Sequence, residues 1–106
     1  MKLVILSIAM VGALLANQVQ ALDAKASEAL AQKSGCLACH AVQNKVVGPS
    51  YKEVAAKYKN DKGAEARLAA KIKAGGSGVW GPIPMPPHPQ VKEDDIKTIT
   101  QWILSL

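Results

Sequence analysis

The sequence feature that most constrains the fold is an apolar run at the amino end. If this run belongs to a cleaved leader, fewer residues remain to form the mature domain. Residues 3–16 are almost all apolar and follow a short basic start. The run is about fourteen residues long, which is shorter than the roughly twenty that a membrane-spanning helix needs. The small-residue pattern at 19–21 is typical of a signal peptidase site. We therefore predict a signal peptide over residues 1–21 rather than an uncleaved anchor, with cleavage after Ala24 as the second choice.

The domain that remains, residues 22–106, is short and poor in aromatic side chains. It keeps 85 of the 106 residues, and its aromatic residues are Tyr51, Tyr58, Trp80 and Trp102. Domains this small bury little surface, so disulfides, a metal or a large cofactor usually supplement the core. Two cysteines exclude a multi-bridge disulfide scaffold. The formal net charge of the full 106-residue chain is +5, which indicates acidic partners but is too small to indicate nucleic acid.

Apolar residues at helical spacing predict an all-α domain of about four short helices, over 23–34, 50–58, 64–74 and 93–105. Ser50 and Glu53 match the capping box that opens a helix. Residues 75–89 hold four glycines and five prolines, and regular helices or strands do not tolerate that density. We expect no strand, and an irregular loop between the last two helices.

The same periodicity predicts which side of each outer helix is buried. In the first helix the residues at helical spacing are Ala26, Ala29, Leu30 and Lys33. In the last helix the apolar side consists of Ile96, Ile99, Trp102, Ile103 and Leu104. Acidic residues fill the first turn of that helix, where the helix dipole favours negative charge.

Two cysteines and a histidine stand together as Cys36-Leu37-Ala38-Cys39-His40. The pattern C-x-x-C-H is the attachment signature of c-type haem. Positions i, i+3 and i+4 share one face of a helical turn, so both sulfurs and the imidazole can point the same way. The thiols of Cys36 and Cys39 can then form thioether bonds to haem while His40 reaches the iron. We predict one covalently bound haem c.

Three other uses of the cysteine pair are less well supported. A redox pair of thioredoxin type requires a β-α-β context, which the predicted elements lack. A zinc site requires four ligands, and only His88 or a carboxylate could complete the set. A disulfide between Cys36 and Cys39 would close too small a loop to stabilise the domain much.

Met85 is the only methionine outside the predicted signal peptide, and it lies in a proline-rich stretch at 81–87. A lone methionine is by default a core filler. A proline-stiffened loop instead holds a side chain in one place, and a His/Met pair is a common ligation for electron transfer. We therefore predict Met85 as the sixth iron ligand. His88 is the rival, which we interpret as an exposed loop histidine and a possible pH-dependent neighbour of the haem.

Over its whole mature length, the chain resembles the small bacterial class I cytochromes c of the cytochrome c-551/c-552 group. The motifs that carry the resemblance are Gly35 to His40, Val47-Gly48-Pro49, Gly78-Val79-Trp80-Gly81, Ile83 to Pro87 and Gln101 to Leu104. The resemblance implies a fold around one haem, with His40 and Met85 on opposite haem faces. It also implies that the carbonyl of Pro49 accepts a hydrogen bond from His40. Trp80 and Lys71 would hydrogen-bond or pair with a haem propionate, and Leu30 and Ala31 would lie near the last helix.

The chain departs from this group at three positions. Similar proteins often have Asn where this chain has His88, Arg where it has Lys71, and Ser or Thr where it has Lys92. The departures affect the expected potential and stability but leave the class unchanged.

With both axial positions filled, the iron has no open site, so we expect an electron carrier rather than an enzyme. The expected role is a soluble, monomeric periplasmic shuttle with no membrane span after cleavage. It would carry single electrons from a quinol-oxidising membrane cytochrome complex to a nitrite reductase or terminal oxidase. Lysines near the haem edge would steer docking to acidic partners. The alternatives are a ligand-binding or peroxidatic haem protein whose Met85 dissociates, and a bound subunit of a respiratory complex.

Overall fold

The computed structural model describes residues 23–106, so the predicted signal peptide lies outside the described residues. The elements are α1 (Ala24–Lys33), a 3₁₀ turn η1 (Cys36–Ala38), α2 (Tyr51–Lys57), α3 (Ala64–Ala74) and α4 (Glu93–Leu104). Over these residues no strand forms, and the single β-bridge joins Gly76 to Met85. The all-α class and all four predicted helices are therefore confirmed.

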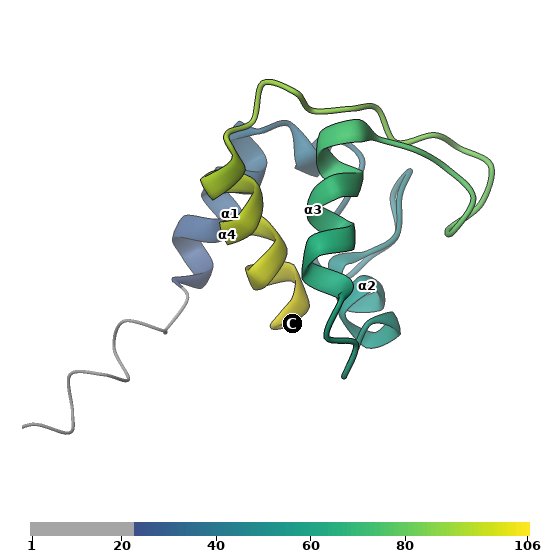
Figure 1. Ribbon diagram of the computed structural model, residues 1–106, viewed down its shortest axis with the longest axis horizontal. Helices are drawn as coiled ribbons and strands as arrows, with labels where there is room; N and C mark the ends of the chain where they lie inside the picture. The colour runs from purple at the N-terminus through teal and green to yellow at the C-terminus, as the bar shows by residue number, and fades with distance from the viewer. Residues whose placement is uncertain (1–22) are drawn as a thin grey trace, which may run out of the picture.

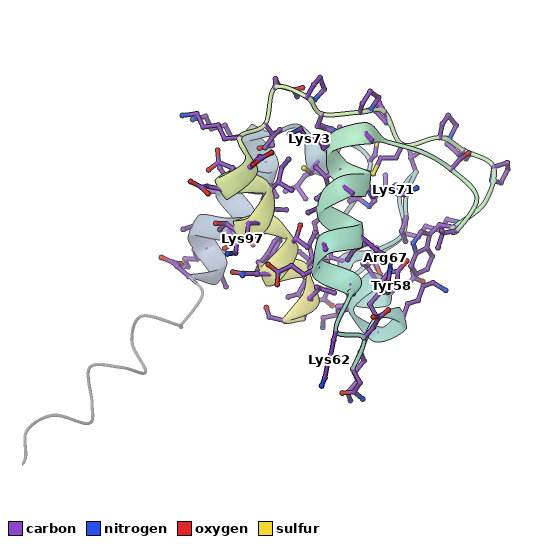
Figure 2. The ribbon with its side chains drawn as sticks, in the orientation of Figure 1. Tyr58, Lys62, Arg67, Lys71, Lys73 and Lys97 are labelled. Carbon is purple, nitrogen blue, oxygen red and sulfur yellow. The ribbon has the colours of Figure 1, made fainter. Side chains whose placement is uncertain are left out.

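Helix α4 is the centre of the arrangement, because it contacts α1, α2 and α3. Figure 1 shows α4 beside both α1 and α3, while the long segment between α3 and α4 runs over the top of the molecule. Lys73 lies near the end of α3 (Figure 2). Its ammonium group donates a hydrogen bond to Glu93 at the start of α4, at 2.8 Å. This ion pair ties together the two ends of the long loop.

The predicted capping box at the start of α2 is present. The Ser50 hydroxyl oxygen accepts from the Glu53 backbone N–H at 3.1 Å, and the Glu53 carboxylate accepts from the Ser50 N–H at 3.1 Å. Asp23 caps α1 in the same way by accepting from the Ala26 N–H at 3.1 Å. Lys92 precedes α4 without a side-chain cap. These caps satisfy backbone donors that a helix start leaves without partners.

The buried side of α1 differs from the predicted one. Ser27 and Ala31 are buried, whereas Ala26 and Ala29 are exposed and Leu30 is only partly buried. The reason is that α1 packs against α4 through small side chains, which let the helices approach closely. The spacing of apolar residues alone does not predict that Ser27 is buried while Ala26 and Ala29 are exposed.

The buried side of α4 largely follows the prediction. Ile96, Ile99, Trp102 and Ile103 are buried, while Leu104 at the helix end is only partly buried. Thr100 was not expected in the core, yet it is fully enclosed, at 0% exposure. Its position follows from the three helices that surround α4, which bury more than one stripe.

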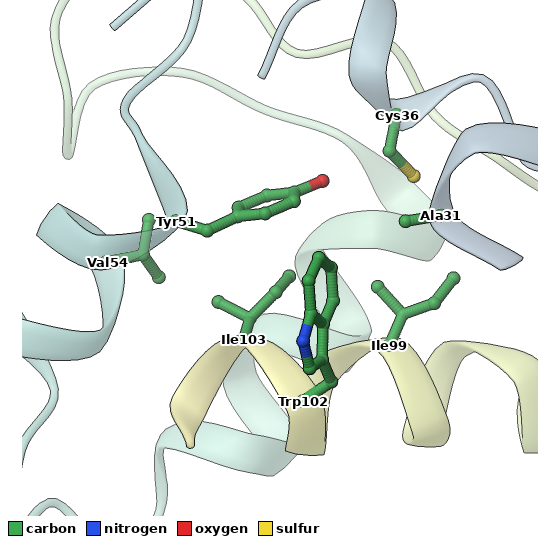
Figure 3. Packing of buried hydrophobic residues seen from close by; sticks show 7 residues of the cluster. All are labelled: Ala31, Cys36, Tyr51, Val54, Ile99, Trp102 and Ile103. Atoms are coloured by element: carbon green, nitrogen blue, oxygen red, sulfur yellow. The ribbon is translucent and has the colours of Figure 1, made fainter. Parts of the chain in front are cut away.

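One cluster of buried residues joins the helices and the cysteine segment (Figure 3). Tyr51 of α2 packs its ring edge-on against Trp102 of α4, with ring centroids 5.5 Å apart. Ala31 of α1 and Ile99 of α4 lie in the same cluster, together with Cys36. The crossing of the first and last helices is thus present, and it places the cysteine segment against the core.

The loop between α3 and α4 is fixed at its base. Gly76 and Met85 exchange two backbone hydrogen bonds, of 3.0 and 2.8 Å, and the His88 N–H donates to the Ile72 carbonyl at 3.0 Å. Gly75 has a φ of +71°, and a side chain there would lie 2.5 Å from the Met85 carbonyl oxygen. Only glycine fits this approach. The loop therefore returns beside the end of α3 and holds Met85 there.

Candidate functional site

A cavity of about 720 Å³ opens between the cysteine segment, α2, α3 and the loop. Its walls are mostly apolar and include Cys36, Cys39, His40 and Met85. The charged residues that line it are Lys45, Arg67 and Lys71, and no carboxylate lines it. The cavity therefore suits a large apolar group that also carries negative charge.

The cysteine segment forms the turn η1 rather than a full α-helical turn. Cys36 is buried and Cys39 is partly buried, and neither sulfur is bonded to another. Burial raises the pKa of the Cys36 thiol, although a hydrogen bond with Tyr51 and a backbone hydrogen bond oppose the rise. Cys36, Cys39 and His40 all line the same cavity. The tight turn thus brings the three residues to one site.

Three neighbours fix the ring of His40. Its Nδ1 donates to the carbonyl oxygen of Pro49 at 2.7 Å, the contact that the resemblance implied. The ring of Tyr51 stacks on it with a centroid distance of 5.1 Å and an interplanar angle of 21°. A Cβ at Gly48 would lie 2.5 Å from the Cε1 of His40. With Nδ1 as the donor, Nε2 keeps a lone pair that can bind a metal.

Met85 comes 45 residues after His40 in the sequence, yet it lines the same cavity. Its side chain is partly buried and packs against Ile72, Val91 and Ile96. The bridge with Gly76 fixes its backbone. The thioether is therefore held at the cavity wall by both backbone and packing.

His88 does not match its interpretation as an exposed loop histidine. The residue is partly buried, and its Nδ1 is enclosed without a hydrogen-bond partner among residues 23–106. It is absent from the residues that line the cavity, whereas Met85 is among them. His88 lies inward because its backbone N–H donates a hydrogen bond to the Ile72 carbonyl near the end of α3.

Lys71 and Trp80 both line the cavity. The Lys71 side chain lies over Gly76, where an added Cβ would be 2.6 Å from its Nζ. Trp80 is 43% exposed. Arg67, one turn before Lys71 on α3, also lines the cavity and was not predicted as a site residue. Its i, i+4 spacing from Lys71 was the available signal.

The described part of the chain offers no group of three or more His, Cys, Asp or Glu side chains that could hold a metal ion, so the zinc alternative gains no support. In the same residues no helix is long and apolar enough to cross a bilayer.

The cavity fits a haem group by the chemistry of its walls. Two thiols and a fixed imidazole come from one segment, and a fixed thioether comes from the distant loop. Lys45 and Lys71 can pair with propionates, whereas Arg67 pairs with Asp61. The chain has few aromatic side chains to fill a core, and the apolar cavity leaves room for a large cofactor in their place.

Known proteins agree with this fit. The cytochrome c family profile matches residues 24–106. Cytochrome c-551 of Pseudomonas aeruginosa is 50% identical over 101 residues, covering 95% of this chain and 93% of the relative. Cytochrome c-552 of Nitrosomonas europaea is 53% identical over 83 residues, covering 78% of this chain and 81% of the relative. The crystal structure of wild-type Nitrosomonas europaea cytochrome c552 has a TM-score of 0.72 at 53% identity, covering 74% of this chain and 98% of that one.

The profile spans every described helix, and the relatives match over most of their own length. The expected resemblance is thereby confirmed, as is covalently bound haem c as the cofactor. The fold, the cavity and these similarities lead to one conclusion: the chain belongs to the cytochrome c family of haem-binding electron carriers.

Proposed function

We propose that this chain carries single electrons through one haem held by Cys36, Cys39, His40 and Met85. The observation that supports this best is that the four side chains line one cavity, although Met85 lies 45 residues after His40 in the sequence. Cys36 and Cys39 would form the thioether bonds, and His40 and Met85 would be the axial ligands. When bound, haem supplies an iron that gains and loses one electron.

The protein's part in this function is to hold the ligands still. The hydrogen bond from His40 Nδ1 to Pro49 fixes the ring and its protonation, so that Nε2 keeps the lone pair that would bind the iron. Met85 is fixed by its bridge to Gly76 and by its packing. A thioether ligand raises the potential by favouring the reduced iron. With both axial positions filled by the chain, no substrate reaches the iron, and the protein is not an enzyme.

Lys71 and Trp80 are the residues proposed to bind the propionates. Both line the cavity near its mouth, where carboxylates can meet water on one side and the protein on the other. A cation and an indole N–H are suitable donors to a carboxylate.

The surface near the cavity mouth fits redox partners with acidic rims. Large apolar side chains are exposed there, namely Val47, Val79, Trp80 and Ile83, which all line the cavity as well. Lysines near them include Lys45 and Lys71, which line the cavity too. An apolar centre with a cationic rim suits brief docking, since the charges speed the encounter. The proposed partners are a membrane quinol-oxidising complex as donor and a nitrite reductase or terminal oxidase as acceptor.

We propose the periplasm as the place of action, and a soluble monomer as the working form. The support is the signal peptide expected over residues 1–21 and the need to attach the haem outside the cytoplasm. Cell fractionation tests this directly. Mass spectrometry of the purified protein should give an amino terminus at Leu22 or Lys25 and the added mass of one haem.

Optical spectra of the purified protein test the ligation. The oxidised wild type should show the absorption of an iron–sulfur bond, and Met85→Ala should lose it. The reduced wild type should not bind carbon monoxide promptly at neutral pH. Survival of the sulfur band in Met85→Ala, or prompt carbon monoxide binding by the wild type, would contradict the proposed ligation.

A further inference from the structure

Lys57, the last residue of α2, contacts two aromatic rings at the rim of the haem cavity. Its Nζ lies 5.5 Å from the centroid of the Trp80 ring and 5.9 Å from that of Tyr58. An ammonium group within about 6 Å of a ring centroid is attracted to the ring. Tyr58 and Trp80 both line the cavity, whereas Lys57 is exposed and does not. The lysine therefore contacts two wall residues from the solvent side.

The two rings belong to different parts of the fold. Tyr58 directly follows α2, and Trp80 stands in the loop between α3 and α4. Within residues 23–106, the hydrogen bonds that join this loop to other elements lie outside 77–84. Inside that stretch, the hydrogen bond from Gly78 N–H to the Gly81 carbonyl only closes the loop on itself, at 2.8 Å. Lys57 thus links the loop tip to α2 through its contact with the Trp80 ring.

We propose that Lys57 is a positioning residue for the haem, because it holds the Trp80 ring toward α2 and keeps the cavity mouth closed. The inference rests on haem binding in this cavity, and it does not depend on which residue is the sixth ligand. The apolar shell around a metal site controls solvent access and thereby the redox potential. A mouth released from Lys57 admits water, which stabilises the more highly charged oxidised iron. The midpoint potential therefore falls when the contact is removed.

Removing any nearby lysine also lowers the potential, since a positive charge disfavours oxidised iron. The experiment therefore compares Lys57→Met with Lys59→Met in the haem-loaded protein. Lys59 is also exposed and lies two residues further on, with no aromatic contact among the described residues. Lys57→Met is expected to lower the midpoint potential more than Lys59→Met. Lys57→Arg should keep the wild-type potential, because arginine also carries the charge and stacks on aromatic faces.

A double-mutant cycle shows whether Lys57 acts through Trp80. In a Trp80→Leu background, Lys57→Met should lower the potential no more than Lys59→Met does. Proton NMR of the reduced wild type tests the contact itself, since the ε-methylene protons of Lys57 should be shifted upfield of those of Lys59 by the ring currents.

Four results would overturn the proposal. These are equal potentials for the Lys57→Met and Lys59→Met proteins, a Lys57→Arg protein that resembles Lys57→Met, an undiminished effect in the Trp80→Leu background, and absence of the upfield shift. The spectra of Met85→Ala report on iron ligation separately, so failure here leaves the proposed ligation standing.

Discussion

Gly48 shows how one missing side chain can position the proposed iron ligand His40. The space that a Cβ would occupy is filled by the His40 ring, with Cε1 only 2.5 Å and Nδ1 2.9 Å from the position of that Cβ. Glycine is required here for close approach, since Gly48 is not among the glycines with a positive φ. The same ring is held from other directions by Pro49 and Tyr51. His40 therefore has little freedom to move.

Gly48→Ala should displace the His40 ring and weaken its hydrogen bond to Pro49. We expect a loss of about 1–3 kcal/mol in the free energy of unfolding, as for other overpacked sites. The midpoint potential should shift as well. Denaturant unfolding of the haem-loaded protein measures the first effect and a redox titration the second. In the control Gly63→Ala, the new methyl group meets the flexible end of Arg67 and, at an ordinary contact distance of 3.6 Å, a carboxylate oxygen of Asp61. Equal effects of the two substitutions would contradict the assigned role of Gly48.

Thr100 is a polar residue whose burial has a measurable cost. It is 0% exposed, and its hydroxyl has no hydrogen-bond partner in the described structure. Thr100→Val keeps the shape and removes the unsatisfied group, so the free energy of unfolding should rise by about 1 kcal/mol. Denaturant titration measures this rise, and the slope of the unfolding free energy against denaturant concentration should stay unchanged. Thr98→Val is the comparison, because the Thr98 hydroxyl donates to the Asp94 carbonyl at 3.0 Å and its removal should give no gain.

At the scale of elements, the junction of α3 and α4 closes the loop that carries Met85. The Lys73–Glu93 pair and the Gly76–Met85 bridge both lie at this junction. A hydrogen bond with Lys73, together with its charge, lowers the pKa of Glu93 below its ordinary value of 4.5. The folded protein thus holds the ionised form of Glu93 more strongly than the unfolded chain does.

The stabilisation from Glu93 should therefore depend on pH. It is fully present above pH 4.5, the ordinary value, and is lost as the pH falls through the lowered pKa in the folded state. Glu93→Gln should be less stable than the wild type at neutral pH, and the two proteins should converge in acid. The effect is small because the carboxylate is fully exposed. Asp94→Asn removes a charge from the same helix turn without an ion-pair partner, so an equal pH-dependent loss there would argue against the pairing.

At the scale of the whole molecule, the haem replaces a conventional core. The helices surround a cavity of about 720 Å³, and residues of both buried clusters line it. A double variant, Cys36→Ala with Cys39→Ala, cannot attach the group covalently. It should lose its cooperative unfolding transition, because the empty cavity leaves the helices without their shared contact surface. Thermal unfolding followed by circular dichroism checks this, and a sharp transition at the wild-type temperature would contradict it.

The charge distribution should make partner encounters sensitive to salt. The three charged residues that line the cavity are all cationic, and the acidic residues at 93–95 lie at the start of α4. Electron transfer with an acidic partner should therefore slow steeply as ionic strength rises, since salt screens charges beyond about 10 Å at 0.1 M. Stopped-flow kinetics measure the rate, with a small neutral reductant as the control. A partner rate independent of salt would refute steering by these charges.

Local patterns in the sequence were sufficient for the elements and for the chemical type of the site. Helix spacing, the capping box at Ser50 and the glycine and proline density at 75–89 all depend on neighbours within a few residues. The Cys36 to His40 signature is likewise local. Such patterns are readable because the interactions that they report form within one turn or one loop.

Only the tertiary structure decided which residues from distant segments share a wall, a core or a rim. It buried Ser27 and Thr100, drew His88 inward and placed Arg67 on the cavity, and none of these positions follows from helical periodicity. It also brought Lys57 to Trp80 across the cavity mouth. The physical reason is that burial and contact depend on how whole helices pack around a large shared cavity. The sequence by itself therefore determined the helices and the haem chemistry, whereas packing determined the surroundings that hold and adjust that chemistry.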